Sequence, residues 1–154
     1  MGRYYNTDTG REGKFMFGVQ PSDDPQYMGM GENPSYIQYY ASDEDEPEVR
    51  KKLDEQYDIL GVDKEKRVYY MKDWNEFDKF EKEVLDDKVW IKVKRNDKET
   101  LDKYKGQTTW ASDNDDEVMF ERKNMALVLA RIRLGVVILS DIKDQGYCQL
   151  EAET

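Results

Sequence analysis

The stretch over 117–143 contains the longest apolar run in the chain and dominates its pattern of hydrophobic and polar positions. When this stretch is placed on a helix at about 100° per residue, apolar side chains fill most of the circumference. A helix of that kind must be buried on most of its sides. The pattern therefore predicts a long C-terminal helix over about 116–143, with the rest of the chain packed around it.

The flanking residues are consistent with these ends. Ser112 and Asp113 are residue types that cap helix N-termini, and the acids that follow them suit the positive end of the helix dipole. Lys143 and Gly146 suit the C-terminal end. A second interpretation remains open, because β-branched residues follow Gly135 and a shorter helix could end there and release a strand.

Two polar residues, Asn124 and Arg131, project from the apolar sector of this predicted helix. A buried guanidinium without a partner costs several kcal/mol, so Arg131 must be satisfied in some way. In one interpretation it extends to solvent or pairs with an acid. In the other it lines an internal anion site, with Asn124 as its neighbour.

Shorter elements precede and follow the long helix. Alternation of apolar and polar residues predicts strands, and apolar spacing of three or four residues behind a capping residue predicts helices. This order of elements predicts an α+β domain, in which three helices cover one face of a largely antiparallel sheet of about five strands. Residues 98–111 fit either a short helix or a return strand. The predicted strands are 14–20, 36–40, 67–71, 89–94 and 147–152, and the shorter predicted helices are 42–60 and 74–85.

The length of 154 residues predicts a single domain over 1–154. Its first part, 1–40, is a strand-and-loop region that carries eight aromatic residues, and 42–154 forms the helix-and-strand core. Tyrosine gives a large contact area at little cost in rotamer entropy. The aromatic residues of 1–40 therefore either cover the core or form an exposed recognition surface.

The net charge of -10 limits the classes of partner. Nucleic acid and anionic lipid both require clustered Lys and Arg, so we expect neither direct nucleic-acid binding nor membrane binding. A partner protein with a basic surface suits this charge better. Exposed aromatic residues are also compatible with a homo-oligomer. Cys148 is the only cysteine, and no apolar leader is present, so we expect a cytoplasmic location.

The sequence contains no histidine, which excludes Ser-His-Asp and Cys-His triads and histidine-containing zinc sites. The doublets Asp23-Asp24 and Asp115-Asp116 are the carboxylate pairs that a Mg²⁺-dependent or carboxylate enzyme could use. An acidic surface produces such doublets by chance. We therefore expect no catalytic residues, no metal site and no cofactor.

In addition to a carboxylate or Mg²⁺-dependent enzyme, two binding functions are compatible with the sequence. The first is a non-catalytic acidic protein that sequesters or inhibits a basic, nucleic-acid-handling partner, as virus-encoded inhibitors do. The second is a binder of a small anionic ligand such as a nucleotide, in which a cation meets the phosphate and tyrosines stack on the base. The candidate ligand-binding residues are Arg3, Tyr4, Tyr5, Lys14, Gln20, Tyr36, Tyr39, Asn124, Arg131 and Arg133.

Overall fold

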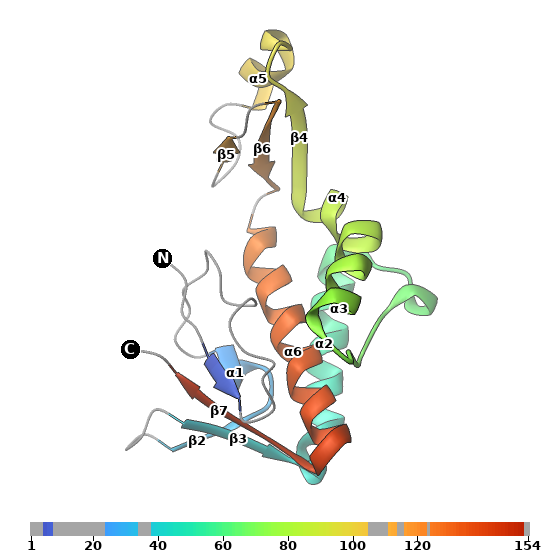
Figure 1. Cartoon of the computed structure of the whole chain (residues 1–154), viewed down its shortest axis with the longest axis vertical. Helices are drawn as coiled ribbons and strands as arrows, with labels where there is room; N and C mark the ends of the chain where they lie inside the picture. The colour runs from blue at the N-terminus through green and yellow to red at the C-terminus, as the bar shows by residue number, and fades with distance from the viewer. Residues whose placement is uncertain are drawn as a thin grey trace.

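A computed structural model of the chain describes residues 5–7, 24–33, 38–104, 111–113, 116–122 and 124–152. Its central element is the helix α6, Met125–Gln145. This helix contacts a four-stranded antiparallel sheet on one side and the helix α2, Glu46–Leu60, on another (Figure 1). The predicted α+β class is therefore confirmed.

The four-stranded sheet has the strand order β1-β7-β3-β2. Burial alternates along its two central strands, as expected for a sheet with one covered face. Tyr39, Ala41 and Leu150 are at most 2% exposed, whereas their neighbour Tyr40 is 51% exposed. The inner face thus packs on α6, and the outer face is open at Tyr40. The strands are β1 (Tyr5–Thr7), β2 (Gly31–Asn33), β3 (Gln38–Ser42) and β7 (Tyr147–Ala152).

Several shorter helices accompany α2 and α6. The short helix η1 leads directly into α2, and α3 continues through a π-helical turn, η3, into α4. Side chains from α2, from α6, from the α3 to α4 segment and from the inner face of the sheet share one hydrophobic core. The helices are α1 (Asp24–Tyr27), η1 (Asp43–Asp45), η2 (Lys64–Lys66), α3 (Trp74–Phe80), η3 (Glu81–Leu85), α4 (Asp86–Val89) and α5 (Lys98–Tyr104).

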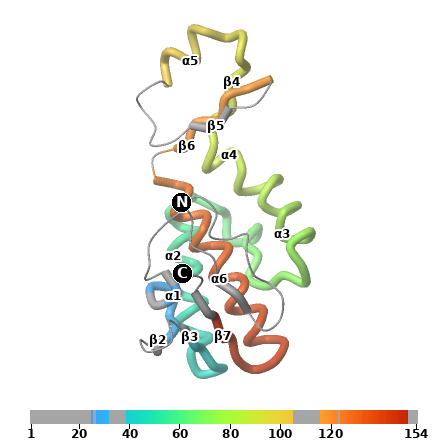
Figure 2. Tube along the Cα trace, turned by 60° about the vertical axis from the view of Figure 1, so that its left-hand side comes forward, coloured from blue at the N-terminus to red at the C-terminus, as the bar shows by residue number. Residues whose placement is uncertain are grey.

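A second sheet forms an arm that projects from one end of the helical body (Figures 1 and 2). Its strand order is β4-β6-β5, and both pairs are antiparallel. Val93 and Phe120 are buried in the arm, and the ring of Tyr104 from α5 lies 6.1 Å from that of Phe120. The arm therefore has a small apolar cluster of its own. The strands are β4 (Trp90–Lys94), β5 (Ala111–Asp113) and β6 (Glu117–Glu121).

Many of the predicted elements are present. The final strand has its predicted bounds, β4 and α2 lie inside their predicted ranges, and the helix predicted at 74–85 continues to Val89. The strand predicted at 36–40 is β3, at 38–42. Residues 98–104 form a helix. The described strands form two sheets, of four and three strands, and the strand predicted at 14–20 lies outside the described residues.

The predicted N-terminal end of the long helix is wrong. Residues 117–121 form the strand β6, because Val118 and Phe120 pair with β4, and Ser112 and Asp113 lie in β5 rather than at a helix cap. The helix begins after Asn124, whose φ of 61° is left-handed. The interpretation that ended the helix at Gly135 is also wrong, since α6 continues to Gln145. The predicted cap at Gly146 is confirmed by its φ of 86°.

The strand predicted at 67–71 is wrong, because no described strand pairs with this segment. Side chains of the two large helices hold it instead. The Tyr57 hydroxyl of α2 donates a hydrogen bond to the Val68 carbonyl oxygen at 2.5 Å, and the Met71 N–H donates to Ser140 Oγ of α6 at 2.8 Å. Side chains of α2 and α6 thus form hydrogen bonds with the Val68 carbonyl and the Met71 N–H, which strand partners would otherwise supply.

Candidate functional site

Residues 43–48, named here the acidic turn, carry five carboxylates between β3 and α2. The turn forms because the Asp45 side chain accepts a hydrogen bond from the Ser42 N–H at 2.9 Å, which fixes the chain where it enters the helix. Pro47 then occupies the first turn of α2. Carboxylates at this end are stabilised by the positive pole of the helix dipole.

Most carboxylates of the acidic turn are accessible to solvent. Asp43, Glu44 and Glu48 are exposed, and Glu46 is half-buried. Within the described part of the chain, no ion pair joins these four carboxylates to a Lys or Arg. The turn therefore presents negative charge to solvent that no described Lys or Arg neutralises in an ion pair.

An aromatic pair adjoins this turn on the outer face of the sheet. The rings of Tyr40 and Tyr147, named here the tyrosine pair, lie 6.0 Å apart between centroids with an interplanar angle of 20°. Tyr40 is 51% exposed, so its ring is accessible to solvent. The pair stands on the face opposite the core, because the next residues, Tyr39 and Cys148, are buried.

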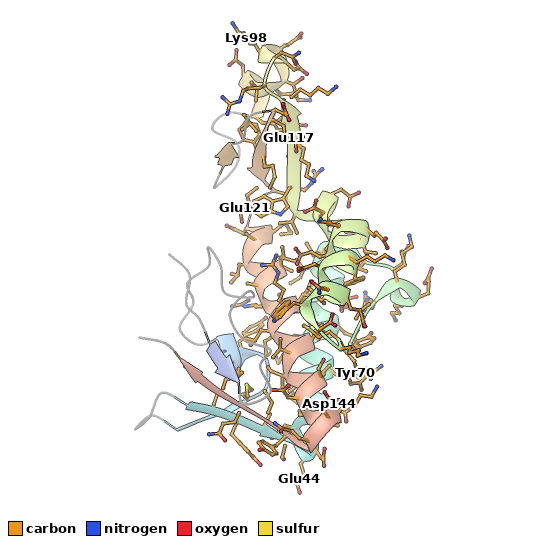
Figure 3. All side chains as sticks on the ribbon, in the orientation of Figure 1. Glu44, Tyr70, Lys98, Glu117, Glu121 and Asp144 are labelled. Carbon is orange, nitrogen blue, oxygen red and sulfur yellow. The ribbon has the colours of Figure 1, made fainter. Side chains whose placement is uncertain are left out.

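The acidic turn lies next to the chain that carries the tyrosine pair. Ser42, which precedes the turn, is the register partner of Tyr147. A Cβ placed on Gly146 would lie 3.6 Å from Asp43 Oδ2, so this carboxylate lies beside the chain that leads into Tyr147. Glu44 lies at this end of the molecule together with Asp144, and Lys98 lies at the opposite end on the arm (Figure 3). The surface combines aromatic rings with carboxylates.

The predicted cation Arg131 is half-buried and stacks on a tyrosine. Its Cζ atom lies 3.9 Å from the centroid of the Tyr27 ring, and Lys52 Nζ lies 5.3 Å from the same centroid. Asn124 is exposed at the N-terminus of α6, about two helical turns away, and is not its neighbour. The structure thus brings Arg131 to the ring of Tyr27, one of the aromatic residues of 1–40.

Arg133 makes a structural ion pair. Its Nε and Nη2 atoms donate to Glu81 Oε1 and Oε2, each at 2.7 Å, and both side chains are largely buried. This bidentate contact joins α6 to the first residue of η3. The guanidinium fork is therefore engaged within the protein.

Tyr39 is only 2% exposed, so it belongs to the core and not to a stacking surface. Tyr5 lies in β1, where the structure describes the backbone. The remaining candidate residues lie outside the described part of the chain: Arg3, Tyr4, Lys14, Gln20 and Tyr36.

The sequence pattern did not identify Tyr147 as a candidate, and it placed 43–48 only within the predicted helix 42–60. The alternation around Cys148 does place Tyr147 on the face opposite the core, so one signal was present. The pairing of Ser42 with Tyr147, which brings the two features together, has no signature in a single sequence.

An enzyme gains no support from the described residues. They contain no group of three or more acidic or cysteine side chains placed to hold a metal ion. Asp116 is exposed, while Asp115 and Asp23 lie outside the described ranges. The carboxylate doublets are therefore not assembled into a site in the part of the chain that can be described.

No protein family model, curated protein or solved structure matches this chain. None of the described helices combines the length and the apolar composition that a membrane span requires. The surface described above is consequently the basis for inferring function.

Proposed function

We propose that this protein is a non-catalytic binding protein that captures a basic partner protein through the acidic turn and the tyrosine pair. The observation that carries the proposal is the set of solvent-accessible carboxylates over 43–48, on a chain of net charge -10. Complementary charge steers association and selects partners. The partner class is a protein that exposes clustered Lys and Arg.

Such clusters occur where proteins bind phosphates, so the partner class includes nucleic-acid-handling proteins. A row of carboxylates occupying a phosphate-binding groove would block that groove. Sequestration or inhibition of such a partner follows from this chemistry. The tyrosine pair adds apolar contact area next to the charge, as aromatic residues commonly do at interfaces.

Capture of a small anion is less well supported. Arg133 is engaged by Glu81, and Arg131 is stacked on Tyr27. The net charge of -10 also repels an anionic ligand at long range. We therefore favour a basic protein partner over a nucleotide.

The proposal predicts that carboxylates of the acidic turn contribute directly to binding of a basic chain. The probe is an octa-lysine peptide, measured by calorimetry at low salt against the wild-type protein and Glu44→Gln/Glu48→Gln. Exposed charge pairs contribute about 0.2–1 kcal/mol each, so the double variant should bind about 2- to 30-fold more weakly. Added salt should weaken wild-type binding by screening.

The matched control is Glu99→Gln/Asp102→Asn, which removes the same charge from exposed positions on α5 in the arm. We expect this control to lose much less affinity than the variant of the acidic turn. Equal losses in the two variants would mean that peptide binding reports only net charge. That result, or binding that salt does not weaken, would contradict the proposal.

A further inference from the structure

We propose that the tyrosine pair makes this surface selective for arginine, so that the partner engages it through an arginine-bearing segment. This inference rests on the proposed function and names the side chain that the surface recognises. Three observations support it: the exposure of Tyr40 and its stacking on Tyr147, the neighbouring carboxylates, and the way this protein holds its own arginines.

The face of a tyrosine ring attracts cations, and the planar guanidinium stacks on it better than a compact, strongly hydrated ammonium does. Tyr40 is 51% exposed, and its ring is within 20° of parallel to that of Tyr147. Among the described residues, no cation lies over the Tyr40 ring. An incoming guanidinium therefore has an accessible aromatic face.

The protein uses arginine in this manner elsewhere. Its two closest described cation-to-ring contacts are Arg131 over Tyr27, at 3.9 Å, and Arg50 over Tyr69, at 4.1 Å. The described lysine contacts are longer, at 4.5 to 5.5 Å. The two shortest described cation-to-ring contacts are thus both made by arginine, although Arg67 lies 5.6 Å from the Tyr57 ring centroid.

Arg67 shows how carboxylates complete such a site. Its Cζ atom lies 5.6 Å from the Tyr57 ring centroid, while Nη1 and Nη2 contact Asp54 Oδ1 at 3.1 Å and Asp58 Oδ1 at 2.6 Å. The Arg67 guanidinium thus lies near a tyrosine ring while its nitrogen atoms pair with two carboxylates. The tyrosine pair and the acidic turn offer this combination on the surface, because Asp43 lies beside the chain that leads into Tyr147.

The test compares octa-arginine with octa-lysine, which carry the same charge, against wild type, Tyr40→Leu and Tyr40→Phe. Wild type should prefer octa-arginine by about 2- to 30-fold, the range expected for one cation–π contact. Tyr40→Phe keeps a ring and should retain the preference. Tyr40→Leu should bring the ratio of affinities close to one, because it should weaken octa-arginine binding more than octa-lysine binding.

A wild type without arginine preference, or a preference that survives Tyr40→Leu, would overturn this inference and leave the proposed function intact. If neither peptide bound at low salt, the proposed function would itself be contradicted. Tyr147→Leu supplies a second variant at the other ring, with the same expected loss of preference. Circular dichroism of each variant verifies that the comparison is made between folded proteins.

Discussion

Arg67 and Tyr57 show at the scale of single residues how the segment after α2 is held. The Arg67 side chain is only 5% exposed, and its guanidinium contacts Asp54 and Asp58 of α2 as well as the Val62 carbonyl oxygen. A buried guanidinium is tolerated only with such partners. Together with the hydrogen bond from Tyr57, these contacts replace a sheet as the support of this segment.

Burial raises the pKa of the Tyr57 phenol well above its ordinary value of 10.0. A pKa raised on folding gives stability that is complete below the unfolded pKa. That stability is lost as pH rises through the folded pKa. Folding stability should therefore fall above about pH 10.

Tyr57→Phe tests this expectation at two pH values. At pH 8 the variant should be less stable by about 1 kcal/mol, because it loses the hydrogen bond to the Val68 carbonyl oxygen. At pH 11 the difference should shrink or reverse, since one pH unit above the unfolded pKa corresponds to about 1.4 kcal/mol. Urea denaturation at both pH values measures the difference. An equal difference in the free energy of unfolding at pH 8 and pH 11 would contradict the assigned role of the buried phenol.

At the scale of elements, the contact between α2 and α6 depends on Gly135. A Cβ at this position would lie 2.8 Å from Met28 Cε and 3.2 Å from Leu53 Cδ1. The glycine thus allows Met28, which lies between α1 and β2, and Leu53 of α2 to approach the α6 backbone closely. It serves packing, and not the end of a helix.

A large side chain at position 135 should force these elements apart. We expect Gly135→Leu to lower the free energy of unfolding by about 1–3 kcal/mol, the usual cost of overpacking a core. Gly135→Ala should cost less, since Met28 Cε can move and alanine favours a helix. Chemical denaturation with both variants measures this order. A Gly135→Leu variant as stable as wild type would contradict the close packing.

Elements defined by local periodicity could be predicted, and those defined by distant partners could not. The apolar spacing behind 42–48 identified α2, and alternation identified β7. Val118 and Phe120 extend the apolar run of α6 in the sequence, but their pairing with β4 makes them a strand. Residues 67–71 have the alternation of a strand, yet side chains of α2 and α6 hold them.

At the scale of the whole molecule, the sequence predicts the amount of charge but not its arrangement. The net charge of -10 pointed to a basic partner, whereas the open surface beside the acidic turn depends on how β3 pairs with β7. Strand register also decides that Tyr39 is buried and Tyr40 exposed. Tyr40 consequently belongs to the candidate surface, and Tyr39 does not.

The acidic turn and the tyrosine pair lie at the end of the molecule opposite the arm. Glu44 lies at one end, and Lys98 and Glu117 lie in the arm at the other (Figure 3). A partner bound at the acidic turn therefore leaves the arm free of contact unless it spans the full length of the molecule. Because the acidic turn and the arm lie at opposite ends, a residue-by-residue measurement can distinguish binding at one end from binding at the other.

The most direct test is an amide NMR titration of the uniformly labelled protein with octa-arginine at low salt. The proposed binding surface predicts the largest chemical-shift changes at Tyr40, over 43–46, and at Glu48 and Tyr147, with little change in α5 and β4 of the arm. Changes confined to the arm, or spread evenly over all exposed carboxylates, would contradict it.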